Sequence, residues 1–289
     1  MLIEDVYTQV FPIGGQSKNE AFKVQLSPPS DTLTALVASA LNSRDRGWRH
    51  ELPSALADFF HECSQSLITF GEVVYEIVYF SNPEDHKVAK FELQKVRPFT
   101  IKRHRGQLVQ IIPQEVVLQR KAPPFIPLRE DHMLVFSLPA KLRRTLDTTL
   151  ESLAVLSRKL MPEFAMRDFV HAASKYHYDS ANQIQAQKLA LAEAGKQIGW
   201  NARALLYDDL LEFYFFERQL RFERFKVVLR TLIRDTLNRG LHLIGEKMGF
   251  RAQLVVEGLP TISDVERAER DLKSGSKPFG KILAPFRFY

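Results

Sequence analysis

The sequence contains one cysteine, Cys63, in 289 residues. A single thiol excludes an intrachain disulfide and any zinc or iron–sulfur site that needs several cysteines. No uninterrupted apolar run approaches the roughly 18–20 residues that cross a bilayer, and the N-terminus lacks a basic segment followed by an apolar one, the pattern of a secretory signal. These absences predict a soluble intracellular chain without a membrane partner.

Recognised catalytic motifs are also missing. Gly14-Gly15 lacks the strand, the lysine and the spacing of a phosphate-binding loop, and no G-x-S-x-G, H-E-x-x-H or kinase motif set occurs. His61 and Cys63 lie two residues apart on an expected helix and therefore point to different faces. We interpret them as a surface histidine and a core cysteine rather than as metal ligands. The sequence thus predicts no catalytic residue, no metal site and no cofactor.

What is present is the composition of a globular protein. Hydrophobic residues make up 45% of the chain and charged residues 26%, which is enough apolar material for a core and excludes disordered, collagen-like and coiled-coil classes. The 40 Lys and Arg residues exceed the 34 Asp and Glu residues, which leaves a net charge of +6. This excess permits a polyanionic partner without requiring one.

The first half of the chain predicts two helices followed by β-structure. Apolar residues recur on one helical face over 33–41, and a second helix begins at Pro53 and ends at Gly71, a residue suited to a helix-to-strand turn. The period then changes, so residues from about 72 to 138 are expected to be mostly β, in a meander rich in turns. The strands of this meander are expected over 73–80, 87–96, 100–104, 108–112, 116–118 and 133–136.

The second half predicts helices with one interruption. A helical stripe begins near Leu142 and continues past Pro162, which must kink or restart the helix. A helix of weak apolar character is expected over 181–198. The pattern over 201–216 fits either a strand or a helix, and we interpret it as a connector that favours β-structure.

The strongest predicted element is a helix over 218–248, which is followed by a strand over 253–256. A final helix is expected over 264–273, because Ser263 and Glu266 have the spacing of a capping box. Together these elements indicate an α+β fold. The long helix has an apolar face that we assign to the core or to contacts between subunits, and its main residues are Phe222, Phe225, Leu229, Leu232 and Leu237.

Basic residues are the only recurrent polar feature. They gather at 102–105, at 120–121, at 141–144, at 158–159 and along the long helix. Because no group of aromatic residues interleaves with them, a platform for single-stranded nucleic acid is not indicated. Any nucleic-acid contact is expected to be non-specific contact with the phosphate backbone. The candidate residues are Lys141, Arg143, Arg144, Arg158 and Lys159.

Two other functions fit parts of the sequence. Asp208, Asp209 and Glu212 are closely spaced carboxylates of the kind that divalent cations need, so a metal-dependent nuclease or another nucleic-acid-processing enzyme is one alternative. A monomeric adaptor that binds a protein partner through the arginine-flanked helix is the other. The nuclease predicts cleavage of DNA with a divalent cation, and the adaptor predicts a monomer.

The order of elements resembles that of tailed-bacteriophage portal proteins. The buried helix that runs into GEVVYEIVYF, the phrase LQKVRPFTIKRHRGQLVQIIP and the closing segment REDHMLVFSLP are similar to the wing domain of that family. Further on, portal proteins have a long helix with an L-N pair, then a strand, then a charged helix before a glycine. The segments of this chain that resemble these three elements are FKVVLRTLIRDTLNRGL, AQLVVEGL and SDVERAERDLKSG. The resemblance covers roughly residues 55 to 280.

The resemblance implies a non-enzymatic conduit for DNA. Portal proteins form a closed ring, typically a dodecamer, at one capsid vertex of the virion, and they are assembled in the host cytoplasm. Double-stranded DNA passes through the ring during packaging and ejection, and the terminase, the head–tail connector and the major capsid protein are the implied partners. The implied regions are an N-terminal wing-like region (1–140), a stem helix (141–177), a short clip with its return (178–216), and a long wing helix with a strand and a C-terminal helix (217–289), with a crown reduced or absent.

Overall fold

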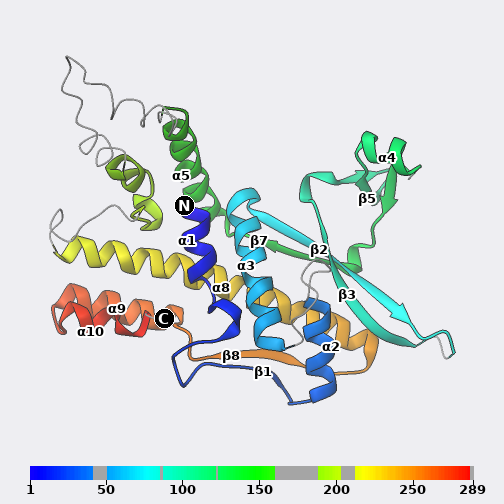
Figure 1. Ribbon diagram of the computed structural model, residues 1–289, viewed down its shortest axis with the longest axis horizontal. Helices are drawn as coiled ribbons and strands as arrows, with labels where there is room; N and C mark the ends of the chain where they lie inside the picture. Colours follow the sequence, from blue (N-terminus) through cyan, green and yellow to red (C-terminus); the bar gives the residue numbers. More distant parts are fainter. Residues whose placement is uncertain (42–50, 85–86, 122, 160–187, 203–211, 287–289) are drawn as a thin grey trace, which may run out of the picture. The chain divides into compact units, whose positions relative to one another are not determined.

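The computed structural model describes residues 1–41, 51–84, 87–121, 123–159, 188–202 and 212–286. Contacts divide the chain into two units, each made of separate stretches (Figure 1). Unit 1 contains residues 1–2 and the described parts of 139–227 and 260–287, and unit 2 contains those of 3–138 and 228–259. Helix α8 contributes its first part to unit 1 and its remainder to unit 2.

Unit 2 contains three small antiparallel sheets and the helices that pack on them. The sheets have the strand orders β1-β8, β3-β2-β7 and β4-β5-β6. The predicted mostly β region is confirmed, but its strands form two separate sheets rather than one continuous meander, because β7 pairs with β2 and not with β6. The elements of unit 2 before α8 are α1 (Leu2–Gln9), β1 (Lys23–Ser27), α2 (Asp31–Leu41), α3 (Leu52–Phe70), β2 (Glu72–Ser81), β3 (Val88–Val96), β4 (Ile101–His104), β5 (Gln107–Ile111), α4 (Gln114–Arg120), β6 (Phe125–Pro127) and β7 (Met133–Ser137), with short 3-10 turns at 13–15, 98–100 and 130–132.

Helix α3 begins and ends where the sequence predicts. Pro53 lies in the first turn, where a backbone N–H would have no partner within the helix, so the N–H that proline lacks is not needed there. Gly71 ends the helix with a φ of 78°, and its N–H donates to the carbonyl oxygen of Leu67 at 2.9 Å. This left-handed conformation suits glycine and turns the chain directly into β2.

The core of unit 2 lies between α3 and the β3-β2-β7 sheet. Phe59 of α3, Tyr75 of β2 and Phe136 of β7 form an aromatic triangle with ring centroids 5.2–5.9 Å apart. Each of the three side chains is at most 3% exposed. Aromatic packing of this kind adds to the burial of large apolar surfaces, so this triangle is a main source of the unit's stability.

The second part of α8 (Glu212–Met248) packs on β7 and is tied to β8 (Gln253–Glu257). A Cβ atom added at Gly240 would lie 2.9 Å from a methyl carbon of Leu134, so the helix approaches β7 closely at this glycine. Asn238 donates to the carbonyl oxygen of Leu254 at 3.1 Å and accepts from its N–H at 2.7 Å. The side chain therefore acts like a neighbouring strand for one residue of β8.

Unit 1 contains α5 (Ala140–Lys159), a helical stretch over 188–194 with a 3-10 turn at 196–198, the first part of α8, α9 (Ile262–Ser274) and α10 (Phe279–Leu283). Arg224 of α8 forms two hydrogen bonds with Glu269 of α9, at 2.9 and 3.1 Å. Phe216 stacks on Phe279 with a centroid distance of 4.7 Å. The buried cluster of this unit consists of Phe216, Leu220, Val227, Val265, Ala268, Leu272, Ile282, Leu283 and Phe286.

Several sequence predictions need correction. Residues 116–118 are not a strand but part of α4, which starts after Pro113. Glu115 in its first turn and Arg120 in its last turn have the charges that the helix dipole favours at those ends. Residues 212–216 are helical rather than β, and α8 begins six residues before Arg218, because Phe216 is buried against α9 and α10.

The cap of the C-terminal helix is also placed two residues earlier than predicted. Thr261, not Ser263, accepts a hydrogen bond from the N–H of Asp264, and the Asp264 carboxylate accepts one from the N–H of Thr261. Aspartate therefore closes this capping box in place of Glu266.

Other predictions are confirmed or lie outside the described residues. The strands over 73–80 and 253–256 and the helix over 33–41 are confirmed with small changes of bounds. The predicted kink at Pro162, residues 181–187 and residues 203–211 lie outside the described part of the chain. No helix among the described residues combines the length and apolarity that a bilayer crossing needs.

Candidate functional site

The basic residues that the sequence singles out lie on α5, and three of them are in its first turns. The N–H of Arg143 donates to the carbonyl oxygen of Pro139 at 2.9 Å, so the helix starts directly after this proline. Lys141 and Arg144 are exposed. No acidic residue lies in the first turn. Free N–H groups and basic side chains at a helix start both favour an anion, so this end of α5 can contact phosphate groups.

Arg143 differs from its two neighbours because it has an intrahelical partner. Its Nε and one terminal nitrogen each lie 2.8 Å from the Asp147 carboxylate. This two-point ion pair balances the guanidinium charge within the helix and fixes the orientation of the Arg143 side chain. Lys141 and Arg144 are therefore the stronger candidates for a contact with another molecule.

The two remaining candidates lie at the far end of the same helix. Arg158 and Lys159 are in the last turn of α5, and their side chains lie outside the described residues. Arg158 lies 17 positions after Lys141, which corresponds to about 26 Å along a helix. The structure therefore does not gather the five predicted basic residues into one patch, and their nucleic-acid role stays a prediction.

The predicted apolar face of α8 is only partly buried. Phe225, Leu229 and Leu237 are at most 3% exposed. Phe222 and Leu232 are half-buried at the edge of this face, and Phe222 lies under Lys226, whose Nζ atom is 5.0 Å from the ring centroid. Core packing thus accounts for the first three residues, while a contact between subunits at this face stays a prediction.

A polar cavity of about 410 Å³ lies in unit 1 between α5 and residues 193–197. Thr148, Thr149 and Ser152 line it from α5, but each hydroxyl donates to a carbonyl oxygen four residues earlier. Lys196 at the rim pairs with Glu193 at 3.0 Å. Because the groups around this cavity already have partners, it offers little to an anionic ligand.

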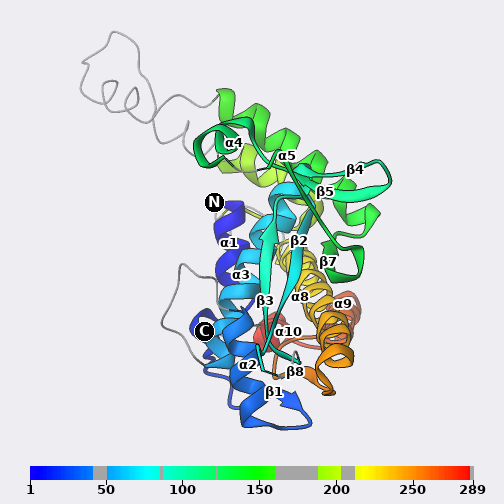
Figure 2. The same cartoon turned by 90° about the vertical axis from the view of Figure 1, so that its right-hand side faces the viewer.

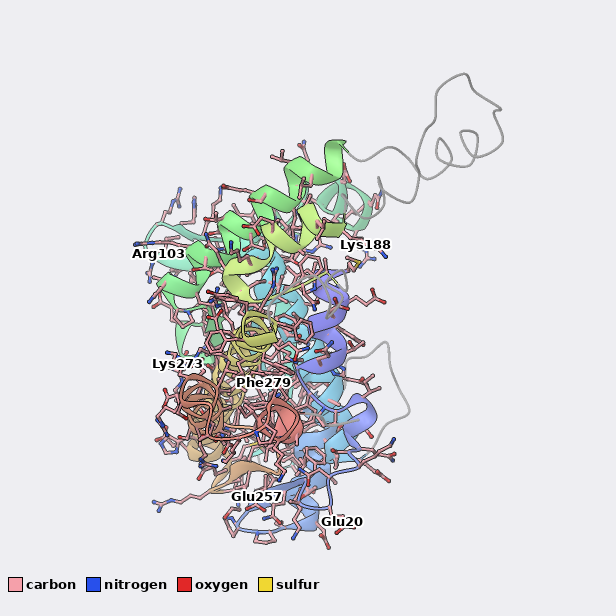
Figure 3. All side chains as sticks on the ribbon, turned by 90° about the vertical axis from the view of Figure 1, so that its left-hand side faces the viewer. Glu20, Arg103, Lys188, Glu257, Lys273 and Phe279 are labelled. Carbon is pink, nitrogen blue, oxygen red and sulfur yellow. The ribbon has the colours of Figure 1, made fainter. Side chains whose placement is uncertain are left out.

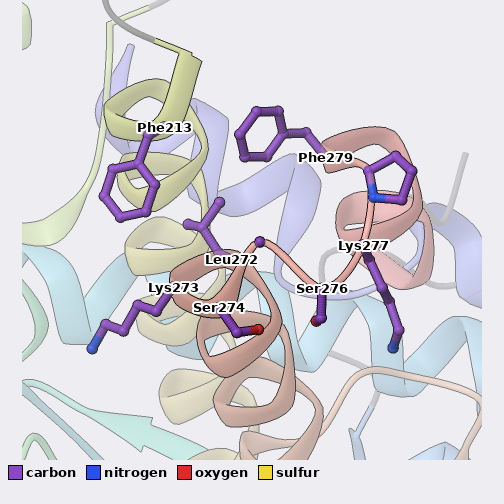
Figure 4. A pocket seen from close by; sticks show the side chains of 9 residues that line it. Phe213, Leu272, Lys273, Ser274, Ser276, Lys277 and Phe279 are labelled. Atoms are coloured by element: carbon purple, nitrogen blue, oxygen red, sulfur yellow. The ribbon is translucent and has the colours of Figure 1, made fainter.

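A second and more apolar pocket of about 590 Å³ lies where α9 turns into α10 (Figure 4). Phe213, Leu272 and Phe279 line its apolar part, and Lys273 and Lys277 stand on opposite sides of it. Lys277 pairs with Asp271 at 2.7 Å and, by this hydrogen bond, holds the pKa of that carboxyl below its usual range. Lys273 is exposed at the rim and extends away from the pocket.

A further basic surface contains the clusters at 102–105 and 120–121, which were not among the predicted nucleic-acid residues. Residues 97–130, which contain β4, β5, α4 and β6 and are called the basic module below, include seven Lys or Arg and two Glu, a net charge of +5. All seven basic side chains are exposed, and that of Arg103 stands outward from the ribbon in Figure 3. Counting charge in this window of the sequence would have found the module. The seven residues are Arg97, Lys102, Arg103, Arg105, Arg120, Lys121 and Arg129.

A cluster of titratable side chains connects the basic module to β2 and α8. Lys247 donates to Nε2 of His132 at 2.6 Å and to the Asp131 carboxylate at 3.2 Å, and its Nζ atom lies 4.9 Å from the Tyr79 ring centroid. The hydrogen bond from Arg129 lowers the pKa of Asp131 to about 2. Partial burial, and then the charge of Lys247, lower the pKa of His132 below its usual value. A neutral His132 accepts the hydrogen bond from Lys247.

Cys63 and His61 are both buried, so the prediction of a surface histidine is wrong. His61 Nε2 lies 3.0 Å from the carbonyl oxygen of Phe11, and its ring packs on Tyr7. The Cys63 thiol donates to the Tyr75 hydroxyl at 3.7 Å, and burial raises the pKa of the thiol far above its usual value. A thiol that stays protonated and inaccessible is a core residue rather than a nucleophile.

The carboxylates of the alternative nuclease site are not placed by the structure. Asp208 and Asp209 lie outside the described residues, and Glu212 is the first residue of α8, with a side chain that is not described. Among the described residues, no three His, Cys, Asp or Glu side chains come together as metal ligands. The nuclease reading therefore stays an untested alternative.

Comparison with solved structures finds a similarity to a chain of a structure described as the virion of a native gene transfer agent (GTA) particle. The TM-score is 0.46 and the sequence identity 11%, over 95% of this chain and 84% of that chain. No protein-family model matches the sequence, and no curated protein matches it. The function is therefore argued from the residues of the chain itself.

Proposed function

We propose that this chain is a structural subunit of a phage-like particle and, more closely, a portal-type protein that forms a ring for the passage of double-stranded DNA. The observation that carries the proposal is the order of the elements. Helix α3 enters the central strand β2, and later the long helix α8 leads into strand β8 and the capped helix α9. This is the order in which the sequence resembles portal proteins.

The L-N pair in α8 gives this order a physical basis. Leu237 is 1% exposed, and Asn238 makes both hydrogen bonds of a strand neighbour with Leu254. The pair therefore joins the long helix to the following strand at a fixed register. The resemblance to portal proteins at the L-N pair therefore concerns residues that hold α8 and β8 together.

In the proposed ring, the wing comprises residues 1–140 and 217–289, the stem begins with α5, and the clip lies within 178–216. Cyclic symmetry repeats Lys141 and Arg144 around the axis, so weak phosphate contacts from each subunit sum without reading a base sequence. The chain acts as a conduit and has no catalytic role. The terminase, the head–tail connector and the major capsid protein are its proposed protein partners in the virion.

Ring assembly is the direct test of the proposal. Mass photometry and negative-stain microscopy of the purified full-length chain are expected to show rings of about twelve copies with a central hole, the number that the resemblance implies. A protein that stays monomeric at all concentrations, salt conditions and with DNA present would overturn the proposal and would favour the adaptor alternative.

Contact with DNA is tested by reversing charge on α5. The paired substitution Lys141→Glu and Arg144→Glu is expected to weaken binding of double-stranded DNA by assembled rings and to reduce the steepness of its salt dependence. Arg143→Gln is the matched control, since Arg143 already pairs with Asp147 and is expected to change binding less. Equal loss in both variants would contradict the assignment of the contact to Lys141 and Arg144.

A further inference from the structure

The β4-β5-β6 sheet of the basic module exposes large apolar side chains. Figures 1 and 2 show β5 at the end of unit 2 that is far from β1 and β8. A three-stranded sheet usually packs a hydrophobic face against another element. Among the strand residues of this sheet only Val109 is buried, while Phe125 (43%), Ile126 (41%) and Ile111 (40%) are exposed. This surface is therefore open to another molecule.

The strand register divides the sheet into an open side and a more covered one. Lys102 pairs with Val109 across β4 and β5, and Ile111 pairs with Phe125 across β5 and β6. Paired residues, and residues two apart on one strand, point to the same side of a sheet. All residues of this side except Val109 are exposed, whereas most of those on the opposite side are half-buried. The open side, called the aromatic face below, carries Lys102, His104, Gln107, Val109, Ile111, Phe125 and Pro127.

Two aromatic rings meet on the aromatic face. The ring centroids of His104 and Phe125 lie 5.3 Å apart, and both side chains are exposed. Val109 lies between them in the register and is 3% exposed, so the two rings rest over a buried aliphatic residue. His104 and Phe125 are 21 positions apart in the sequence. The fold, rather than a local run of residues, therefore creates this aromatic surface beside the basic cluster at 102–105.

The aromatic face is basic and has no carboxylate among its seven residues. Lys102 lies on the face, and Arg105 is exposed in the turn between β4 and β5. Neither has an ion-pair partner among the residues that the structure describes. The two acidic residues of the basic module lie elsewhere, since Glu115 is on α4 and Glu130 pairs with Arg103 of the opposite side at 2.6 Å. Lys102 and Arg105 are therefore available to an anionic partner.

We propose that the aromatic face binds single-stranded nucleic acid, DNA or RNA, without reading a base sequence. Bases of a single strand stack on exposed aromatic rings, and basic side chains contact the phosphates between them. His104 and Phe125 supply the rings, while Lys102 and Arg105 supply the positive charge. The inference depends neither on ring assembly nor on the duplex contact proposed for α5.

The combination of rings and charge selects this partner. A duplex keeps its bases stacked on one another, so it would contact the basic side chains and leave the rings uncovered. An acidic protein segment would do the same. A purely apolar partner would cover the rings and leave the neighbouring cations without a counter-charge. A single strand satisfies both, because every nucleotide has a base to stack and a phosphate to pair.

Matched strands with and without bases test the role of stacking. Fluorescence anisotropy measures the affinity of the full-length chain for labelled oligothymidylate of about twelve nucleotides, and for an abasic strand of equal length and charge. The thymidylate strand is expected to bind at least about tenfold more tightly than the abasic strand. An oligouridylate strand of the same length distinguishes DNA from RNA, and tight binding of either one supports the proposal. Equal binding of the thymidylate, uridylate and abasic strands would overturn it.

Two neighbouring residues of β6 provide a matched pair of variants. Phe125 and Ile126 are exposed to nearly the same degree but point to opposite sides of the sheet. Phe125→Ala is expected to weaken binding of the thymidylate strand at least about fivefold and to leave the affinity for a duplex unchanged. Phe125→Trp should keep the affinity, and Ile126→Ala should match the wild type. Equal losses in Phe125→Ala and Ile126→Ala would contradict the assignment. Circular dichroism and the midpoint of thermal unfolding check that all three variants are folded.

Two neighbouring residues of β4 test the charge in the same way. Lys102→Gln is expected to weaken binding of the thymidylate strand and to reduce the slope of log affinity against log salt by about 0.7, the value for one phosphate contact on a single strand. Arg103 points to the opposite side and already pairs with Glu130. Arg103→Gln should therefore change the slope less, and an equal change in both variants would count against the aromatic face as the site.

Competition and assembly measurements decide between the remaining partners. Polyglutamate of the same charge is expected to displace the thymidylate strand much less well than unlabelled thymidylate does. If it competes equally well, the surface binds anions in general and the inference is overturned. If Phe125→Ala keeps its affinity for the strand but needs more protein to assemble, the face is a contact between subunits and the inference is likewise overturned. Mass photometry of the wild type tests the proposed ring separately, so either proposal can fail while the other stands.

Discussion

The two three-stranded sheets of unit 2 differ in what covers them. The β3-β2-β7 sheet packs on α3, and the aromatic side chains between them are almost fully buried. The β4-β5-β6 sheet has the same number of strands, but it exposes aromatic and aliphatic residues and a net charge of +5. Strand number therefore does not tell whether a sheet is a core or a surface. The first sheet forms the core of unit 2, whereas the second exposes apolar and basic side chains.

The sharpest test of this contrast removes one phenylalanine from each sheet. Phe136→Ala is expected to lower the free energy of unfolding by about 3–5 kcal/mol, because Phe136 is fully buried in the aromatic triangle. Phe125→Ala is expected to change it by less than about 0.5 kcal/mol in the dissociated chain. Urea denaturation measures both. A large loss with Phe125→Ala would mean that the β4-β5-β6 sheet has a core of its own.

The two-stranded sheet β1-β8 extends the comparison, because it is smaller than the two three-stranded sheets and yet is anchored by a side chain of α8. Asn238 of α8 binds both backbone groups of Leu254, the second residue of β8. Asn238→Ala is expected to cost about 2 kcal/mol of unfolding free energy, since it leaves partly buried backbone groups without a partner. Urea denaturation measures this loss as well.

Two further variants at α8 check the origin of that loss. Asn238→Asp is expected to be nearly as costly as Asn238→Ala, because it keeps the acceptor but removes the donor to Leu254. Glu246→Ala, at a position exposed on the same helix, should cost a few tenths of a kcal/mol at most. If Asn238→Ala behaves like Glu246→Ala, α8 does not hold β8 through this side chain.

The sequence predicts the elements that pack on one another through regular patterns. The helix that ends at Gly71, the strand that follows it and the long helix are all found, because each has an unbroken apolar period and a clear end signal. The strands predicted over 100–104 and 108–112 are also found, and they pair across the turn at Arg105-Gly106. A local sequence pattern was sufficient where the residues of a segment themselves determine its secondary structure.

The parts that the sequence missed depend on distant partners. Strand β1 is five residues long and pairs with β8, more than 200 residues away, so nothing near it in the sequence indicates a strand. His61 is buried because Phe11 and Tyr7 fold over it. The basic module was recognised only as separate charge clusters, because exposure of Phe125 and Leu118 is a property of the fold and not of the sequence pattern.

The junction between the two three-stranded sheets offers the finest test, because a small effect there reports how they are joined. His132 lies in the turn between β6 and β7, and its neighbours are Asp131 and Arg129 from the same turn, Tyr79 of β2 and Lys247 of α8. Its pKa is lowered first by burial and then by the charge of Lys247. An NMR titration should therefore give a pKa for His132 below 6.5, the ordinary value for histidine.

Replacing Lys247 by methionine removes the charge while keeping the side chain's bulk over Tyr79. The pKa of His132 is then expected to rise toward its ordinary value. A lowered pKa in the folded state means that this histidine's contribution to stability is fully present above pH 6.5 and is lost as the pH falls through the folded-state pKa. Lys247→Met should therefore flatten the loss of stability between pH 7 and pH 5, whereas Lys281→Met in unit 1 should leave it unchanged. A His132 pKa that stays the same or falls in Lys247→Met would show that α8 does not contact the junction, which would then be held by the packing of His132 on Tyr79.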